Sequence, residues 1–343
     1  MTVPDRMANK PEASSVGRDK DLSAILEAIA SRDRFVVTSH VMPDGDCICS
    51  LLAFRRLLLA LSKTCCITYT QPVPQKYRFL ADSPAIRDAP PEFSPDVVAV
   101  LDVANRERTA LEKGLLGSVP LVINVDHHAS NTRFGALVLV DENACATCAV
   151  IYRMYQVLGV PIDGQVAQQL FCGIMTDTGR LSFANANTEA FSICADLVGK
   201  GANPDQIARE VYFQEDFALA RLRGRVLSSL ELSGGGKICS MTLSRDVAKW
   251  AEEHGPGPLA LDTEGLVDYA VWIRGVEMGI LFKWSAKDVV KVSFRSGGAA
   301  DVNKFAALFG GGGHRMAAGC TLAGSLADVK RRILTEAERW VKQ

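Results

Sequence analysis

The sequence predicts an α/β fold in which a mostly parallel sheet with helices on both faces precedes a smaller α/β domain. Short apolar runs alternate with stretches of helical length through the first half of the chain, which is typical of strand–helix–strand units. Acidic residues or histidines directly follow several of these apolar runs. After the glycine-rich run 233–236 the predicted strands become shorter, which indicates a second domain.

The composition is that of a folded protein without a membrane span. Of the 343 residues, 48% are hydrophobic and 22% are charged, a balance that excludes a largely disordered chain. No apolar run reaches the roughly 18 residues that a membrane-spanning helix requires. Residues 1–20 are polar and lack the apolar core of a signal peptide, so we expect a disordered leader there. The 10 cysteines lack the spacing of a disulfide scaffold, and we expect reduced thiols in a cytoplasmic protein.

Apolar periodicity assigns the remaining chain to three parts, namely a first domain over 21–187, a helical connector over 188–233 and a second domain over 234–343. In the first domain the predicted strands are 35–39, 64–70, 96–103 and 121–125, and the predicted helices are 21–32, 47–61, 107–116, 144–158 and 165–175. The segment 173–179 is interpreted as a further β-rich run that leads to an aspartate. In the second domain we expect strands at 237–243, 276–283 and 289–294 and helices at 302–308 and 325–341.

Acidic and imidazole side chains gather at the ends of four separate segments of the first domain. They are His40, Asp44, Asp46, Asp102, Asp126, His127, His128 and Asp177. Parallel strands place their ligand sites at their carboxyl ends, and carboxylates with imidazoles suit Mn²⁺ or a similar divalent cation. These side chains are more ligands than one cation requires. We therefore expect two cations that share a bridging carboxylate, best supplied by Asp102, and that clamp a phosphoryl group.

Each of these residues also has an ordinary structural interpretation. A lone aspartate after a strand is usually a turn former or a helix cap, and a lone histidine is usually a satisfied structural group. Repetition of the same chemistry at four segment ends favours a metal site instead. A calcium loop is excluded because Asp44-Gly45-Asp46 lacks the spacing and the distal glutamate of an EF-hand.

The second domain contains a run of glycines, 310–313, directly before a histidine and an arginine. Backbone amides of such a run can approach an anion closely, and an arginine at a strand end can bind phosphate through two hydrogen bonds. For the glycines alone, a flexible linker is the alternative. The residues expected to bind substrate are Arg295, Gly311, Gly312, Gly313, His314 and Arg315.

Taken in order, these motifs resemble those of a known family. His40 to Asp46, the strand ending at Asp102, Asp126-His127-His128 and Gly173 to Gly179 resemble the four motifs of the DHH phosphoesterase superfamily. Residues 310–319 resemble the signature of the DHH-associated C-terminal domain. Together with 292–296 and 301–304, they are similar to the short-oligoribonuclease and phosphoadenosine-phosphate phosphatase branch often called NrnA. The resemblance extends over about residues 21–340.

The resemblance implies a metal-dependent phosphohydrolase that holds two Mn²⁺ ions, with Mg²⁺ or Co²⁺ as alternatives. It implies that His40, Asp44 and Asp102 bind one ion, and that Asp46, Asp102, His127 and Asp177 bind the other. His128 would contact the substrate phosphate and Asp126 would orient a histidine, so these two and Asp102 are the expected catalytic residues. Which of the two adjacent imidazoles binds metal stays open at this point. Met42, Cys47 and Cys49 depart from the usual pattern of the family.

The implied substrates are short oligoribonucleotides, including the dinucleotides pApA and pGpG, and 3′-phosphoadenosine 5′-phosphate, which would yield AMP. A net charge of −1 argues against long duplex DNA or long single strands bound along a broad basic face, and no membrane association is expected. A linear or cyclic dinucleotide phosphodiesterase and a non-hydrolytic nucleotide sensor are the alternatives. The glycine signature argues against a third, a family II inorganic pyrophosphatase.

Overall fold

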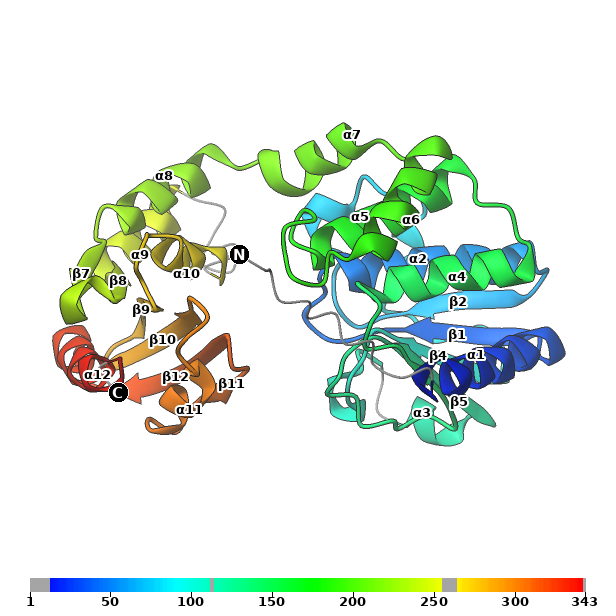
Figure 1. The fold of residues 1–343 in the computed structure, drawn as a ribbon, viewed down its shortest axis with the longest axis horizontal. Coiled ribbons are helices and arrows are strands. Elements are labelled where there is room, and N and C mark those ends of the chain that lie inside the picture. Colours follow the sequence, from blue (N-terminus) through cyan, green and yellow to red (C-terminus); the bar gives the residue numbers. More distant parts are fainter. Residues whose placement is uncertain (1–12, 112–113, 255–263, 342–343) are drawn as a thin grey trace, which may run out of the picture. The chain divides into compact units, whose positions relative to one another are not determined.

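The computed structural model describes residues 13–111, 114–254 and 264–341 of the chain (Figure 1). The chain divides into two compact units, Met1–Gln214 and Glu215–Gln343. Helices α6 (Thr188–Gly199) and α7 (Pro204–Ala208), which belong to the predicted connector, fall in the first unit, and helix α8 (Phe217–Leu227) of that connector falls in the second. The division of the chain into a first domain, a connector and a second domain therefore remains a prediction.

The first unit is built on a six-stranded sheet in which every neighbouring pair is parallel, with the order β3-β2-β1-β4-β5-β6; its strands β2, β1, β4 and β5 are labelled in Figure 1. The strands are β1 (Arg34–Thr38), β2 (Thr64–Thr68), β3 (Ile86–Arg87), β4 (Val97–Leu101), β5 (Leu121–Asp126) and β6 (Leu137–Val140). All residues of β4 are buried, which is typical of a parallel strand covered on both faces. The predicted α/β class with a parallel sheet is confirmed.

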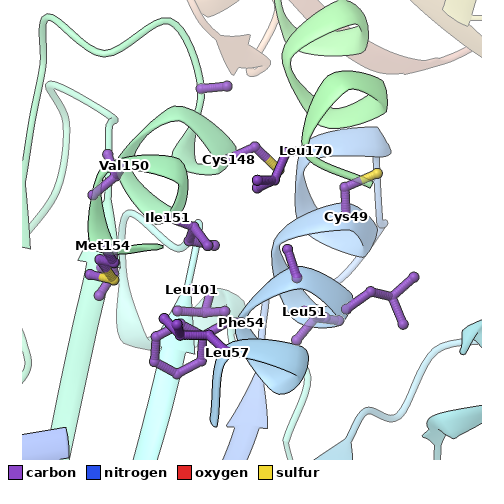
Figure 2. Close-up of a cluster of buried hydrophobic side chains, with 14 of the residues drawn as sticks. Cys49, Leu51, Phe54, Leu57, Leu101, Cys148, Val150, Ile151, Met154 and Leu170 are labelled. Carbon is purple, nitrogen blue, oxygen red and sulfur yellow. The ribbon is translucent and has the colours of Figure 1, made fainter. Parts of the chain in front are cut away.

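Helices cover this sheet unequally on its two faces. The helices of the unit are α1 (Ala13–Ser31), α2 (Gly45–Ala60), α3 (Leu115–Ser118), α4 (Thr147–Leu158), α5 (Gly164–Asp177), α6 (Thr188–Gly199) and α7 (Pro204–Ala208). Helices α2, α4 and α5 pack together over one face through a continuous apolar cluster that includes Cys49, Phe54, Ile151 and Leu170 (Figure 2). A smaller cluster, which includes Val98 and the partly buried Leu115 of α3, covers the other face. Apolar side chains thus bury both faces of the sheet.

Three local predictions for this unit are wrong. Helix α1 begins at Ala13, inside the predicted leader, whereas residues 1–12 of that leader lie outside the described part. The helix predicted over 107–116 is replaced by a 3₁₀ turn at Arg106–Arg108 and the short α3, because Gly114 and Gly117 interrupt the apolar pattern. The aspartate at 177 ends helix α5 and not a strand.

The second unit has a six-stranded mixed sheet in the order β11-β12-β10-β9-β8-β7. Its strands are β7 (Glu231–Ser233), β8 (Ile238–Leu243), β9 (Met278–Ala286), β10 (Val289–Ser296), β11 (Gly312–Gly313) and β12 (Ala317–Ala323). Its helices are α8 (Phe217–Leu227), α9 (Arg245–His254), α10 (Glu264–Val271), α11 (Val302–Ala307) and α12 (Leu326–Trp340). Helices α11 and α12 pack on one apolar cluster, and α8, α9 and α10 pack on another. In the part of the chain that is described, no helix combines the length and the apolar character needed to cross a bilayer.

Candidate metal centre and glycine loop

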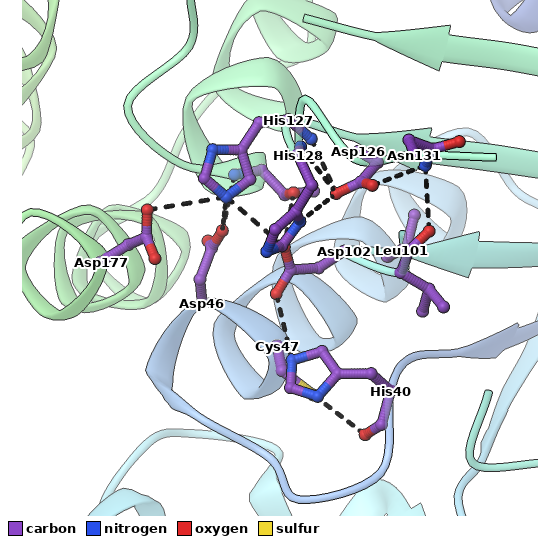
Figure 3. A network of polar contacts seen from close by, with 12 residues as sticks. His40, Asp46, Cys47, Leu101, Asp102, Asp126, His127, His128, Asn131 and Asp177 are labelled. Atoms are coloured by element: carbon purple, nitrogen blue, oxygen red, sulfur yellow. Dashed lines mark hydrogen bonds and ion pairs between the residues drawn. The ribbon is translucent and has the colours of Figure 1, made fainter. Parts of the chain in front are cut away.

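His40 follows strand β1 and lies beside Asp102 (Figure 3), and its ring also approaches Asp44. Its Nε2 is 3.4 Å from Asp102 Oδ2 and 3.8 Å from Asp44 Oδ1, while its Nδ1 is 2.9 Å from the carbonyl oxygen of Val41. Burial disfavours the charged ring, but hydrogen bonds to Asp102 and Asp44 outweigh this effect and raise the pKa of His40 to about 10. A proton is thus held at the position where a divalent cation would compete for the same atoms.

Asp46 is fixed by the first turn of helix α4. Its Oδ2 accepts a hydrogen bond from the Thr147 amide at 2.6 Å, and its Oδ1 accepts one from the Cys148 amide at 2.9 Å. Free amides at a helix N-terminus favour a negative charge. Even so, complete burial and then repulsion from Asp102 raise the pKa of Asp46 to about 6. The carboxylate is therefore well oriented, although burial and Asp102 disfavour its charged form more than His127 favours it.

Asp102 occupies the middle of the cluster. It directly follows strand β4 in a left-handed conformation, with φ of 58°, and its amide donates to the Val125 carbonyl at 2.9 Å. The Thr147 hydroxyl donates to Asp102 Oδ1 at 3.0 Å. Its two carboxylate oxygens face different rings, Oδ2 toward His40 and Oδ1 toward His127. This central position is the one that a bridging ligand requires.

The Asp-His-His segment begins on the last residue of strand β5. Asp126 is fully buried and accepts hydrogen bonds from the amides of His127 and His128, at 2.8 and 3.3 Å. Its Oδ1 also lies 2.7 Å from His128 Nδ1, and its Oδ2 accepts from the Asn131 amide group at 2.5 Å. The hydrogen bond to Asp126 is the main reason why the pKa of His128 is raised to about 9. Asp126 thus orients His128 and not His127.

His127 provides the strongest indication of a cation. Its Nδ1 is 3.3 Å from the Ala144 carbonyl oxygen, so the neutral ring donates from Nδ1 and presents the lone pair of Nε2. Nε2 is buried and has no hydrogen-bond partner among the described residues. From Nε2 the distances are 4.0 Å to Asp46 Oδ2, 3.7 Å to Asp102 Oδ1 and 3.6 Å to Asp177 Oδ2. A lone pair surrounded by carboxylates fits a divalent cation.

Asp177 approaches the cluster from the end of helix α5 (Figure 3). Burial, followed by repulsion from Asp46, raises the pKa of Asp177 to about 8. The side-chain amide of Asn185 donates to Asp177 Oδ2 at 3.3 Å. Neither Asn185 nor Thr147 belongs to a motif visible in the sequence, because Asn185 reaches Asp177 across a loop and Thr147 contacts Asp46 and Asp102 from a distant part of the chain.

The predicted metal ligands of the first unit therefore lie close together. Among the residues that the structure describes, three sets of side chains have ligand atoms within 4.8 Å of one another, namely Asp102-His127-His128, His40-Asp44-Asp102 and Asp46-His127-Asp177. Asp44 also caps helix α2, because its side chain accepts from the Cys47 amide. The capping role and a role in the cluster are thus compatible. The assignment of each ligand to an ion stays a prediction.

In the second unit the side chain of Arg295 lies at the end of strand β10. Its Nε donates to Asp268 Oδ1 of helix α10 at 3.0 Å, and its Nη1 donates to the Phe294 carbonyl at 3.2 Å. The guanidinium is therefore oriented by the protein itself, so a phosphate would have to share it with Asp268.

The glycine run forms part of a β-hairpin, and the flexible-linker alternative is wrong. Strand β11 pairs with β12, and the turn is closed by hydrogen bonds between the backbones of His314 and Ala317, at 2.7 and 3.2 Å. The side chains of His314 and Arg315 are exposed on this turn. Gly311 donates its amide to the Ala306 carbonyl at 3.0 Å, and a Cβ at this position would collide with the Gly319 carbonyl. Close approach to β12 thus explains the glycine there.

The comparisons with known proteins agree with this geometry. Residues 34–174 match the N-terminal domain of the DHH family, and residues 260–343 match the DHHA1 domain. A Thermus thermophilus protein named bifunctional oligoribonuclease and PAP phosphatase NrnA is 31% identical over 335 residues, which are 96% of each chain. The chain belongs to the DHH family.

Other relatives of this DHH protein match it over nearly its full length. The Bacillus subtilis protein with the same NrnA name is 24% identical and matches over 93% of this chain and 98% of its own. The crystal structure of an exopolyphosphatase-related protein from Bacteroides fragilis has a TM-score of 0.84 and 25% identity, and the match covers 95% of the DHH protein and 98% of that chain. The sequence motifs therefore identified the family correctly.

Proposed function

We propose that this DHH protein is a metal-dependent phosphohydrolase that degrades short oligoribonucleotides to mononucleotides and dephosphorylates 3′-phosphoadenosine 5′-phosphate to AMP. The observation that carries the proposal is the buried, unpartnered Nε2 of His127 among three carboxylates. The similarity to proteins named oligoribonuclease and PAP phosphatase, over 96% and 93% of this chain, supports the choice of substrate.

The proposed cofactor is a pair of divalent cations, with Mn²⁺ as the first choice and Mg²⁺ or Co²⁺ as alternatives. His40, Asp44 and Asp102 would hold one ion, and Asp46, Asp102, His127 and Asp177 would hold the other. When bound, such a pair neutralises phosphoryl charge and lowers the pKa of water. The fully buried amide contacts to Asp46 and the Thr147 contact to Asp102 support this arrangement, because they fix the carboxylates before any ion arrives.

His128 is the residue proposed to contact the substrate phosphate. Its side chain is 39% exposed, whereas that of His127 is 13% exposed, so a substrate can reach the His128 ring. Because the hydrogen bond to Asp126 raises the pKa of His128 to about 9, the ring favours its protonated form at neutral pH in the metal-free protein. A fixed cationic donor of this kind stabilises charge on phosphoryl oxygens and holds a proton ready for a leaving group.

The second unit is proposed to bind the nucleotide part of the substrate. Arg295, His314 and Arg315 supply the charged and polar side chains, and Gly312 and Gly313 line the turn that carries two of them. Gly311 would not bind the substrate through its amide, which already donates to the Ala306 carbonyl, but would allow the close approach of the hairpin strands. Catalysis would thus depend on the first unit, and the recognition of short substrates on both.

The test is product release from pApA and from 3′-phosphoadenosine 5′-phosphate in the presence of Mn²⁺. We expect AMP from the first substrate, and AMP with inorganic phosphate from the second. Helix α5 offers a matched pair of variants, since Asp177 ends it within the cluster and Asp163 caps its other end. D177N should lower kcat about 100-fold or more, whereas D163N keeps a good cap and should stay near wild type. If Mn²⁺-loaded wild type hydrolyses neither substrate, the proposal is rejected.

A further inference from the structure

The loop that follows Asp177 exposes a large aromatic ring. Phe183 is 62% exposed, although aromatic side chains normally contribute most of their surface to a core or an interface. The first unit has a second large apolar side chain near the cluster, Met42, which is 71% exposed and lies between His40 and Asp44 in sequence. Of these two, Phe183 alone offers a flat π face.

Hydrogen bonds fix the shape of this loop. The amides of Ser182 and Phe183 both donate to the Thr178 carbonyl at 3.0 Å, and the Arg180 amide donates to the Met175 carbonyl at 2.8 Å. The Leu181 amide donates to the Thr178 hydroxyl at 3.1 Å. Phe183 is therefore displayed on an ordered turn and not on a loose segment.

The backbone of the turn is unusual in a way that requires stabilisation. Three successive residues, Gly179, Arg180 and Leu181, have φ values of 54°, 63° and 61°. Left-handed backbone is unfavourable for residues that carry a Cβ, and such conformations concentrate at functional sites. A side chain on Gly179 would collide with the Phe183 ring, so the ring rests against the backbone two residues beyond Asp177.

The far end of the loop is tied to the same carboxylate. The side-chain amide of Asn185 donates to the Asp177 carbonyl at 3.2 Å and to Asp177 Oδ2 at 3.3 Å, and also to the Cys145 carbonyl at 3.0 Å. Both ends of the segment 178–185 are thus anchored at Asp177. The position of the Phe183 ring is coupled to a side chain of the candidate metal centre.

We propose that Phe183 is the stacking surface for a nucleobase of a substrate whose phosphate lies at the carboxylate–imidazole centre. This inference rests on the proposed function and adds a binding residue to it. Stacking on an aromatic ring tolerates every base, because each base has a π face. The occupant is therefore a nucleoside phosphate without strong base preference.

The experiment compares the binding of AMP and of ribose 5-phosphate to Mn²⁺-loaded protein by isothermal titration calorimetry. The two compounds share the phosphate and the sugar, so their affinity ratio reports the base alone. We expect wild type to bind AMP about 10-fold more tightly. F183A should lower this ratio to near one without changing the affinity for ribose 5-phosphate, and F183W should keep it.

Two further variants separate stacking from general apolar contact. F183L keeps an apolar side chain without a π face and should behave like F183A. F191A removes a 53% exposed phenylalanine from helix α6 and should keep the wild-type ratio. An unchanged ratio in F183A, or a full ratio in F183L, would overturn the inference even if wild type hydrolyses pApA. Wild type that neither hydrolyses pApA nor binds AMP would instead overturn the proposed function.

Discussion

Asp126 and His128 are joined by a 2.7 Å hydrogen bond between Oδ1 and Nδ1 at the end of strand β5. Asp126 is fully buried, whereas the side chain of His128 is partly exposed. This arrangement, in which a buried carboxylate orients an accessible imidazole, is how proteins fix the tautomer and raise the basicity of a reactive histidine.

Replacement of Asp126 by asparagine should therefore lower the pKa of His128 from about 9 toward its ordinary value of 6.5. NMR titration of the metal-free protein with labelled histidine measures this change directly. We expect kcat for pApA to fall about 10- to 100-fold. D96N removes a surface carboxylate that pairs with Arg34 and should leave both quantities unchanged. A His128 pKa that stays near 9 in D126N would contradict this account.

Thr147 contacts two carboxylates of the cluster through different groups, its amide to Asp46 and its hydroxyl to Asp102. T147V removes only the hydroxyl, so it should weaken Mn²⁺ binding about 10-fold while the amide contact to Asp46 persists. T147S restores the hydroxyl and should bind Mn²⁺ like wild type. Competition titration with a metal indicator measures the affinities. Equal affinity in all three proteins would show that the hydroxyl does not orient Asp102.

The pH dependence of stability follows from the two aspartates whose pKa values are raised, from 3.8 to about 6 for Asp46 and from 3.8 to about 8 for Asp177. At a pH above 3.8 and below its raised pKa, each of these carboxyl groups keeps its proton in the folded protein, whereas the same group in the unfolded chain has released it. The free energy of unfolding of the metal-free protein therefore falls as pH rises from about 4 to about 8. The raised pKa of His40, about 10, gives the same sign above pH 6.5.

Mn²⁺ should remove this slope, because a cation replaces the protons and its affinity grows as they dissociate. Thermal unfolding at several pH values, with chelator and with Mn²⁺, measures both curves. We expect the stabilisation by Mn²⁺ to be small near pH 5 and large near pH 8. Parallel curves would contradict the assignment of these aspartates to a cation site.

Gly311 and Gly312 offer a matched test of the glycine hairpin. A Cβ on Gly311 would collide with the backbone of β12, whereas the nearest atom to a Cβ on Gly312 is Asn303 Oδ1 at 3.7 Å. G311A should lower the free energy of unfolding by about 1–3 kcal/mol, and G312A by much less. Urea unfolding followed by tryptophan fluorescence measures the difference. Equal stability of the two variants would mean that the hairpin adjusts to the added methyl group.

The sequence predicted the parallel sheet and the residues of its carboxyl edge because both depend on local patterns. An apolar run followed by an aspartate is visible at Asp102 and Asp126 without any knowledge of the fold. The run before Asp177 is apolar on all sides, since helix α5 is buried between other elements, and such a run does not distinguish a helix from a strand.

Other features of the site could not be predicted because they depend on contacts between distant residues. The amide of Thr147 meets Asp46, which lies about a hundred residues earlier in the chain. The Ala144 carbonyl that sets the tautomer of His127 is a backbone atom, which no residue type reveals. The strand-end position of Arg295 predicts a phosphate ligand but does not reveal its contact with Asp268, which joins separate elements.

The left-handed Asp102, seated between the rings of His40 and His127, brings together stretches that are synthesised far apart, and Asp177 joins them only after the last strand of the parallel sheet. A nascent chain that has built strands β1 to β4 already carries His40, Asp44 and Asp102, whereas the other proposed set also needs His127 and Asp177. Of the two proposed ions, only the one held by Asp46, Asp102, His127 and Asp177 would therefore stabilise the finished first unit over partly assembled forms. In this protein, loading of that second ion would mark the completion of the first unit.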